Sequence, residues 1–185
     1  MAINSGVQKQ TILKPWLDDK KWADNFNAEI KRICGETFIT PALPDDDYSK
    51  ATDLYIYQLA PVRIGCRVRH YTHFKNYNGQ FTIRNTRPNG NGDSEFAKIL
   101  SGWGDYLFYG FSNENENGFA SWMIGDLYVF RYEIFKSMSS KPSEIKYETR
   151  SNGDGSSNFI AFYASSFPAD FIVSEYNFIP DKNSP

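Results

Sequence analysis

Cationic and aromatic side chains alternate in one short stretch of this 185-residue chain. The members of this stretch are Arg69, His70, Tyr71, His73, Phe74, Lys75 and Tyr77. Aromatic faces stack on nucleobases and cations contact phosphates, so this mixture is typical of proteins that bind single-stranded nucleic acid. An ordinary exposed loop would have a similar composition, and the sequence leaves both interpretations open.

A second cationic pattern overlaps the start of this stretch. Apolar residues alternate with arginines there: Ile64, Cys66 and Val68 against Arg63, Arg67 and Arg69. A period of two predicts a strand with one apolar face and one arginine-bearing face. Guanidinium groups bind phosphate through paired hydrogen bonds. Alternating charges also occur on the solvated face of a strand, which is the alternative here.

A carboxylate occupies an unusual place in the first predicted helix, residues 19–34. Its apolar stripe consists of Trp22, Phe26, Ile30 and Ile33, with Asp18 or Asp19 as a possible N-cap and Gly35 as the stop. Glu29 follows Trp22 by seven residues and therefore lies about 20° from it around the helix. We expect Glu29 to pair with an arginine, to lie at the wet margin of the stripe, or to belong to a site.

The elements that must position these residues alternate between strands and helices. Strands are predicted at 53–58, 63–69, 81–86, 106–111 and 120–125, and two or all of the first three are expected to form a meander. One helix is predicted with Asp93 or Ser94 as its N-cap, and another with Asp126 as its N-cap. The segments 141–149 and 158–164 are predicted to be a peripheral strand pair. These elements predict one mixed α/β (α+β) domain over residues 1–185, with a core at about 19–136 and a central mixed sheet flanked by helices.

Composition limits the classes of function. The net charge is −2, so a general basic field is excluded and any contact with DNA or RNA must use a local patch. We expect no membrane partner, because no apolar run approaches the roughly 20 residues of a spanning helix, and we expect a cytoplasmic protein. Two cysteines, Cys34 and Cys66, are expected to be free thiols. A homo-oligomer is compatible with the sequence but not indicated by it.

Three segments resemble a known family in their order and residue types. They are Ala51-Thr52-Asp53-Leu54, Arg67-Val68-Arg69 and Gly104-Asp105-Tyr106-Leu107-Phe108-Tyr109. Together with the helix, strand, strand, strand, helix, strand order, they resemble the αβββαβ core of the PD-(D/E)XK, or restriction-endonuclease-like, nucleases over roughly half the chain. Segments such as Arg63–Arg69, Phe81–Arg84 and Glu95–Gly110 are also similar to uncharacterised phage and prophage proteins, which implies a bacterial or phage-infected cell.

The resemblance implies a nuclease that uses Mg²⁺. Asp53 takes the place of the first acid of the family, and Glu29 is the candidate for a second metal-binding carboxylate. Arg67 and Arg69 stand where the family has its second acid and its lysine, so Arg69 is the candidate for the lysine's catalytic role. Guanidinium binds no metal and is a poor base. The alternative is an inactive nuclease-like scaffold that binds nucleic acid or protein, with phosphate contacts from Arg67, Arg69, Arg84 and Lys98.

Overall fold

The computed structural model describes residues 18–41, 54–56, 62–86, 93–139, 144–153 and 157–178. The chain divides into two compact units, Met1–Tyr57 and Gln58–Pro185, each of which is described by itself. The first unit contains helical residues 18–24, helix α2 (Asn27–Phe38), and an antiparallel pair of short strands, β1 (Ile39–Pro41) and β2 (Leu54–Ile56).

The helix predicted at residues 19–34 is present with two differences. A turn at Asn25 and Phe26 interrupts it, and α2 then continues through Gly35 to Phe38. Gly35 does not adopt a positive φ, and its carbonyl accepts a hydrogen bond from the backbone N–H of Ile39, which closes the helix one turn later than predicted.

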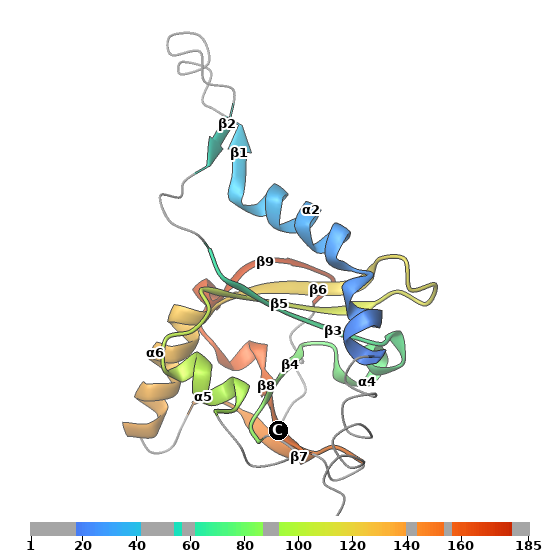
Figure 1. Cartoon of the computed structure of the whole chain (residues 1–185). Helices are drawn as coiled ribbons and strands as arrows, with labels where there is room; N and C mark the ends of the chain where they lie inside the picture. Colours follow the sequence, from blue (N-terminus) through green and yellow to red (C-terminus); the bar gives the residue numbers. More distant parts are fainter. Residues whose placement is uncertain are drawn as a thin grey trace, which may run out of the picture. The chain divides into compact units, whose positions relative to one another are not determined.

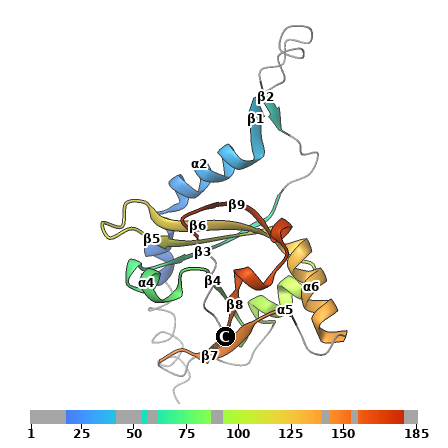
Figure 2. The ribbon, with the colours of Figure 1, turned by 180° about the vertical axis from the view of Figure 1, so that it is seen from behind.

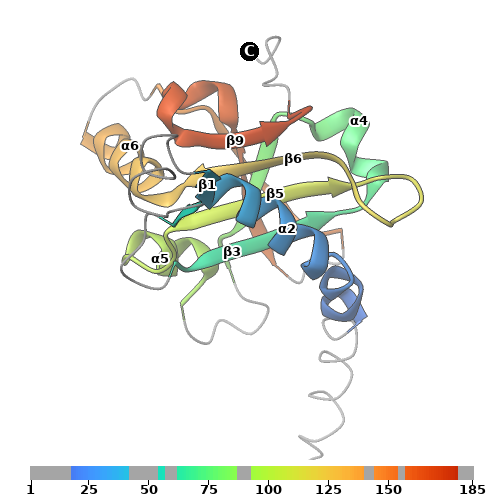
Figure 3. The same cartoon turned by 90° about the horizontal axis from the view of Figure 1, so that it is seen from above.

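The second unit contains two β-sheets. The four-stranded sheet has the order β3 (Ile64–Arg69), β5 (Tyr106–Ser112), β6 (Phe119–Asp126), β9 (Ile172–Tyr176), as Figure 3 shows from above. Strand β3 runs parallel to β5, and the other pairs are antiparallel. The three-stranded sheet is antiparallel and has the order β4 (Gln80–Arg84), β8 (Asn158–Tyr163), β7 (Tyr147–Ser151). The mixed α+β class and a mixed main sheet are thus confirmed.

The predicted meander is not formed. Its three strands are present as β2, β3 and β4, but they belong to three different sheets. Strand β3 pairs with β5, and β4 pairs with β8 near the end of the chain. Local alternation predicts a strand but carries no information about its partner, which is set here by buried residues far away in sequence.

The described part of the second unit has six helical segments, of which two are the 3₁₀ turns η2 (Ala164–Ser166) and η3 (Ala169–Phe171) between β8 and β9. Helix α5 (Glu95–Leu100) and helix α6 (Leu127–Ser139) lie at one end of the two sheets, and the short helix α4 (Phe74–Tyr77) lies at the opposite end, after a 3₁₀ turn η1 (Tyr71–His73) (Figures 1 and 2). Of the two candidate caps of α5, Ser94 is the one used, because Ser94 Oγ accepts from Ala97 N at 3.1 Å. The predicted cap of α6 is confirmed, because Asp126 Oδ1 accepts from Val129 N at 3.1 Å.

The core lies between the two sheets and α6, and it is rich in phenylalanine. Its largest fully buried members include Phe81, Phe130, Phe162 and Phe171. Their rings are in contact, with centroids 5.4 Å apart for Phe81 and Phe162 and 5.2 Å apart for Phe130 and Phe162. Aromatic pairs at such distances stabilise the folded state by more than the burial of their apolar area alone.

The strands expected at the periphery contribute to this core. Strand β8 is the central strand of the three-stranded sheet, and Phe162 within it is 1% exposed. The prediction that this strand pair is peripheral is therefore wrong for β8. The continuous apolar run of β5 is buried as predicted, from Leu107 to Ser112.

Candidate functional site

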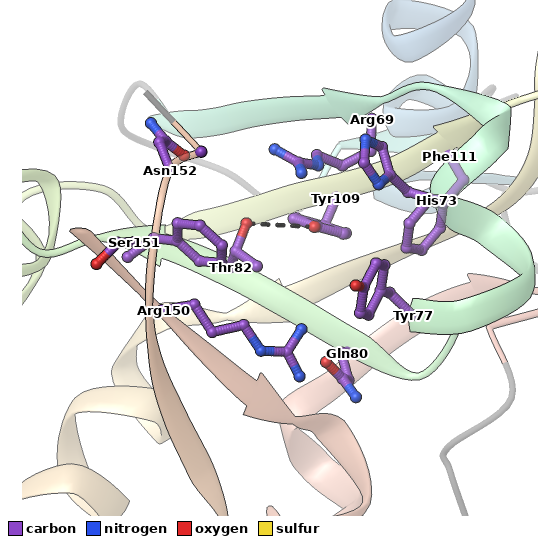
Figure 4. Close-up of a pocket in the computed structure, with 12 residues that line it drawn as sticks. Arg69, His73, Tyr77, Gln80, Thr82, Tyr109, Phe111, Arg150, Ser151 and Asn152 are labelled. Carbon is purple, nitrogen blue, oxygen red and sulfur yellow. Dashed lines mark hydrogen bonds between the residues drawn. The ribbon is translucent and has the colours of Figure 1, made fainter. Parts of the chain in front are cut away.

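A cavity of about 410 Å³ is lined by residues from both sheets of the second unit and from the η1 and α4 segment (Figure 4). Its lining residues are Arg69, His73, Tyr77, Gln80, Thr82, Tyr109, Phe111, Arg150, Ser151, Asn152, Gly153 and Phe159. Among these described residues, two carry a permanent positive charge and none carries a carboxylate. The lining therefore favours an anion.

Arg69 ends strand β3 and extends into the cavity (Figure 4). Within the described part of the chain, its guanidinium has no ion pair and no hydrogen bond. Because a guanidinium carries five N–H donors, Arg69 offers a full set to a bound group.

Arg150, on strand β7, is the second cation. Its Nε and Nη2 donate to Glu148 Oε2 at 2.9 and 2.6 Å, so part of its charge is balanced from one side. Its guanidinium lies 5.0 Å from the centroid of the Tyr77 ring, within cation–π range. Hydrogen bonds from Tyr163 and Arg150 lower the pKa of the Glu148 carboxyl, which stays ionised.

A hydroxyl network lies beside Arg69. The Tyr109 hydroxyl and Thr82 Oγ1 are 3.3 Å apart, and Arg67 Nη1 donates to the same Thr82 oxygen at 3.4 Å. Burial raises the pKa of Tyr109, so its hydroxyl keeps its proton.

Gln80, at the start of β4, differs from these residues because its side chain is unsatisfied. The residue is 6% exposed, and its Oε1 has no hydrogen-bond partner among the described residues. Buried acceptors are nearly always paired in native proteins. This oxygen is thus the one polar atom of the described cavity lining that still requires a donor.

His73 adds an imidazole that stays neutral near pH 7. Burial first, and then the charges of Arg69 and His70, lower its pKa from 6.5. Its ring lies 6.0 Å from the Tyr77 ring. An anion bound in the cavity would oppose the effect of Arg69 and favour protonation of His73.

The predicted phosphate contacts fall into two groups. Arg69 lines the cavity, whereas Arg67 forms an ion pair with Glu95 of α5. Glu95 also accepts the backbone N–H of Arg84 at 2.9 Å, and neither Arg84 nor the exposed Lys98 belongs to the cavity lining. Glu95 therefore neutralises the arginine that was expected to bind phosphate beside Arg69.

The predicted apolar and arginine faces of β3 do not differ in burial: Ile64, Val68, Arg67 and Arg69 are all half-buried. Cys66, expected on the buried side, is exposed, while the Arg67 side chain is 20% exposed and lies next to Thr82. The ion pair with Glu95 and the Thr82 hydroxyl satisfy the half-buried guanidinium, which reduces the usual penalty for removing an arginine from water.

The proposed metal ligands belong to the first unit. Asp53 lies outside the described residues. Glu29 accepts hydrogen bonds from Arg32 at 3.0 and 2.7 Å, which lower the pKa of its carboxyl, so its pairing with an arginine is confirmed. Within the described ranges, no three His, Cys, Asp or Glu side chains are grouped to hold a metal ion. The described donor set does not fit Mg²⁺.

Two other acids have structural roles. Asp105 binds the backbone N–H of Arg63 at 2.8 Å and its Nη2 at 2.9 Å, and Asp126 caps α6. The Arg63 contacts lower the pKa of Asp105 to about 2. Both carboxylates are therefore engaged by the fold itself.

Sequence reasoning found part of the cavity and missed the rest. Arg69, His73 and Tyr77 belong to the cationic and aromatic stretch singled out in the sequence. Gln80 and Arg150 carry no local signal. Arg150 reaches this place only because β4 pairs with β8 and β8 pairs with β7.

The chain was also compared with known proteins. No family model, no curated protein and no solved structure matches it. Among the helices that the structure describes, none has both the length and the apolar character required to cross a membrane.

Proposed function

We propose that this protein binds single-stranded nucleic acid through the cavity around Arg69 and Arg150 and does not cleave it. The observation that carries the proposal is the Arg69 guanidinium, which has no partner within the described chain and faces a cavity whose described lining has no carboxylate. A phosphate would receive bidentate hydrogen bonds from Arg69 and would be attracted by Arg150.

The aromatic side chains of the lining favour the binding of a single strand over the binding of a duplex. Tyr77 lies at the cavity beside Arg150, and Phe159 is a second ring in the lining. Unpaired bases can stack on such rings, whereas the bases of a duplex are already stacked on each other. The nuclease alternative requires Asp53 and Mg²⁺, and the exchange of the family's second acid and lysine for Arg67 and Arg69 argues against it.

The test is fluorescence anisotropy with labelled single- and double-stranded DNA and RNA at several salt concentrations. Arg69→Ala is the informative variant, because it breaks no hydrogen bond within the described chain. We expect it to weaken single-strand binding about tenfold and to reduce the slope of log affinity against log salt by about 1. Lys31→Ala on α2, an exposed cation outside the cavity lining that also has no ion pair within the described residues, is the control.

Two results would contradict the proposal. Equal binding by wild type and Arg69→Ala would remove the cavity from the interaction. Cleavage of any of the nucleic acids in the presence of Mg²⁺, lost in Asp53→Ala, would favour the nuclease instead.

A further inference from the structure

We infer that the cavity holds one nucleotide, with its phosphate at Arg69 and an N–H group of its base donating to Gln80 Oε1 beside Arg150. This inference rests on the proposed nucleic-acid binding and adds to it a base-recognising residue. In this arrangement Gln80 recognises the base, and the positive charge of arginine binds the phosphate.

The first argument is the chemistry of the unpaired atom. Gln80 Oε1 is an acceptor, buried and without a partner among the described residues. A phosphate dianion has acceptors only, so it satisfies the arginines and leaves Gln80 unsatisfied. A ligand that satisfies both must carry an anionic group and a donor, and a nucleotide has both, because bases present N–H donors on their edges.

The second argument is the arrangement of the lining. Figure 4 shows Gln80 beside the guanidinium of Arg150 and the ring of Tyr77, whereas Arg69 lies on the other side of the cavity with Thr82 and Tyr109. A planar base that reaches Gln80 therefore meets a guanidinium plane and an aromatic ring, which are the groups on which bases stack.

The third argument is size. A volume of about 410 Å³ falls within the range of about 300–1,000 Å³ that is typical of small-ligand sites. The cavity thus suits a single nucleotide unit, and neighbouring nucleotides of a strand would lie outside it.

The experiment is isothermal titration calorimetry of the full chain with cytidine 5′-monophosphate and with ribose 5-phosphate, which carries the sugar and phosphate without a base. We expect wild type to bind cytidine monophosphate about tenfold more tightly than ribose 5-phosphate, because one hydrogen bond and one stacked ring are added. Gln80→Met keeps the side-chain shape and removes the acceptor. This variant should bind cytidine monophosphate about three- to tenfold more weakly than wild type and should bind ribose 5-phosphate with unchanged affinity.

Arg69→Ala is the complementary variant and should lower the affinity for both ligands by the same factor. Equal affinities for the two ligands in wild type would overturn the inference, as would an unchanged affinity of Gln80→Met for cytidine monophosphate. Thermal unfolding of Gln80→Met checks that the fold is intact, and Gln80→Leu, which also removes the acceptor, serves as the second variant with the same expected loss if Gln80→Met does not fold.

The inference and the proposed function fail separately. Oligonucleotide binding that depends on Arg69, without any preference for cytidine monophosphate over ribose 5-phosphate, would remove base recognition alone. Tight, Gln80-dependent binding of cytidine monophosphate without oligonucleotide binding would remove the strand-binding function and leave a nucleotide site.

Discussion

Strand β4 separates two buried regions of opposite character. On one side, Phe81 and Ile83 lie in the phenylalanine core and are 0% exposed. On the other side, Gln80 and Thr82 are 6% and 8% exposed and line the cavity. Burial is thus nearly equal on the two sides, and only the chemistry of the side chains differs.

This chemical difference between the two sides of β4 assigns stability to the core side and ligand binding to the cavity side. Apolar rings on the core side gain from the exclusion of water and need no further partner. Polar groups on the cavity side lose hydration on burial and are stable only when they are paired. Thr82 is paired with Tyr109, whereas Gln80 Oε1 remains unpaired. We therefore expect mutations on the core side to affect unfolding and mutations on the cavity side to affect ligand affinity.

The largest expected effect is that of Phe81→Ala. The ring contacts Phe162 and Phe171 at centroid distances of 5.4 and 5.2 Å, and its removal leaves a void that the sheet cannot close. We expect a loss of about 3–5 kcal/mol in the free energy of unfolding, measured by urea denaturation. Phe81→Leu should lose less of the free energy of unfolding. A loss below about 1 kcal/mol for Phe81→Ala would show that the core side of β4 is not tightly packed.

The next effect compares two arginines of β3. Arg67→Ala leaves Glu95 without its ion-pair partner and should cost about 1 kcal/mol, since the pair is partly exposed and screened by solvent. Arg69→Ala breaks no interaction within the described chain, and we expect its unfolding free energy to stay within about 0.5 kcal/mol of wild type. Parallel denaturation curves check this, and the reverse order would mean that Arg69 is the structural residue.

A smaller effect follows from His73. Its pKa in the folded state is below 6.5, because burial and the charges of Arg69 and His70 oppose protonation, and its ring also lies against Tyr77. The unfolded chain therefore binds the proton more readily, so stability is present above pH 6.5 and is lost as the pH falls through the folded-state pKa. We expect wild type to lose more stability than His73→Gln between pH 7.5 and 5.5. Identical losses would contradict this assignment.

The smallest expected effect on stability is that of Gln80→Met. The substitution replaces an unpaired buried acceptor with an apolar group of similar shape, which is close to neutral or slightly stabilising. We expect a change within about 0.5 kcal/mol by the same denaturation measurement. A destabilisation comparable to that of Phe81→Ala would show that Gln80 is held by the fold and is not available to a ligand.

The fold was predictable where the signal is local. The apolar run of β5 and the cap at Asp126 each identify an element from consecutive residues, and both are confirmed. The partners of β3 and β4 were not predictable, because alternation gives a strand without its neighbour. The half-burial of Arg67 was also missed, since its ion pair with Glu95 depends on a helix that follows β3 by more than twenty residues.

The candidate site was predictable to the same extent. Arg69, His73 and Tyr77 are neighbours in sequence, and their composition indicates binding to nucleic acid. Arg150 reaches the cavity only through two strand pairings, and Gln80 is recognised only because its acceptor lacks a partner. An unpaired atom is a property of the three-dimensional structure and leaves no pattern in the sequence.

The pairing of β4 with β8 also has a consequence for the newly made protein. Phe81 lies opposite Phe162, so β4 obtains its neighbour only after most of the chain has left the ribosome. At ordinary rates of translation, the wait is on the order of several seconds. During that time the apolar side of β4 is open to other chains, and we expect a requirement for chaperones during synthesis that the finished protein no longer has.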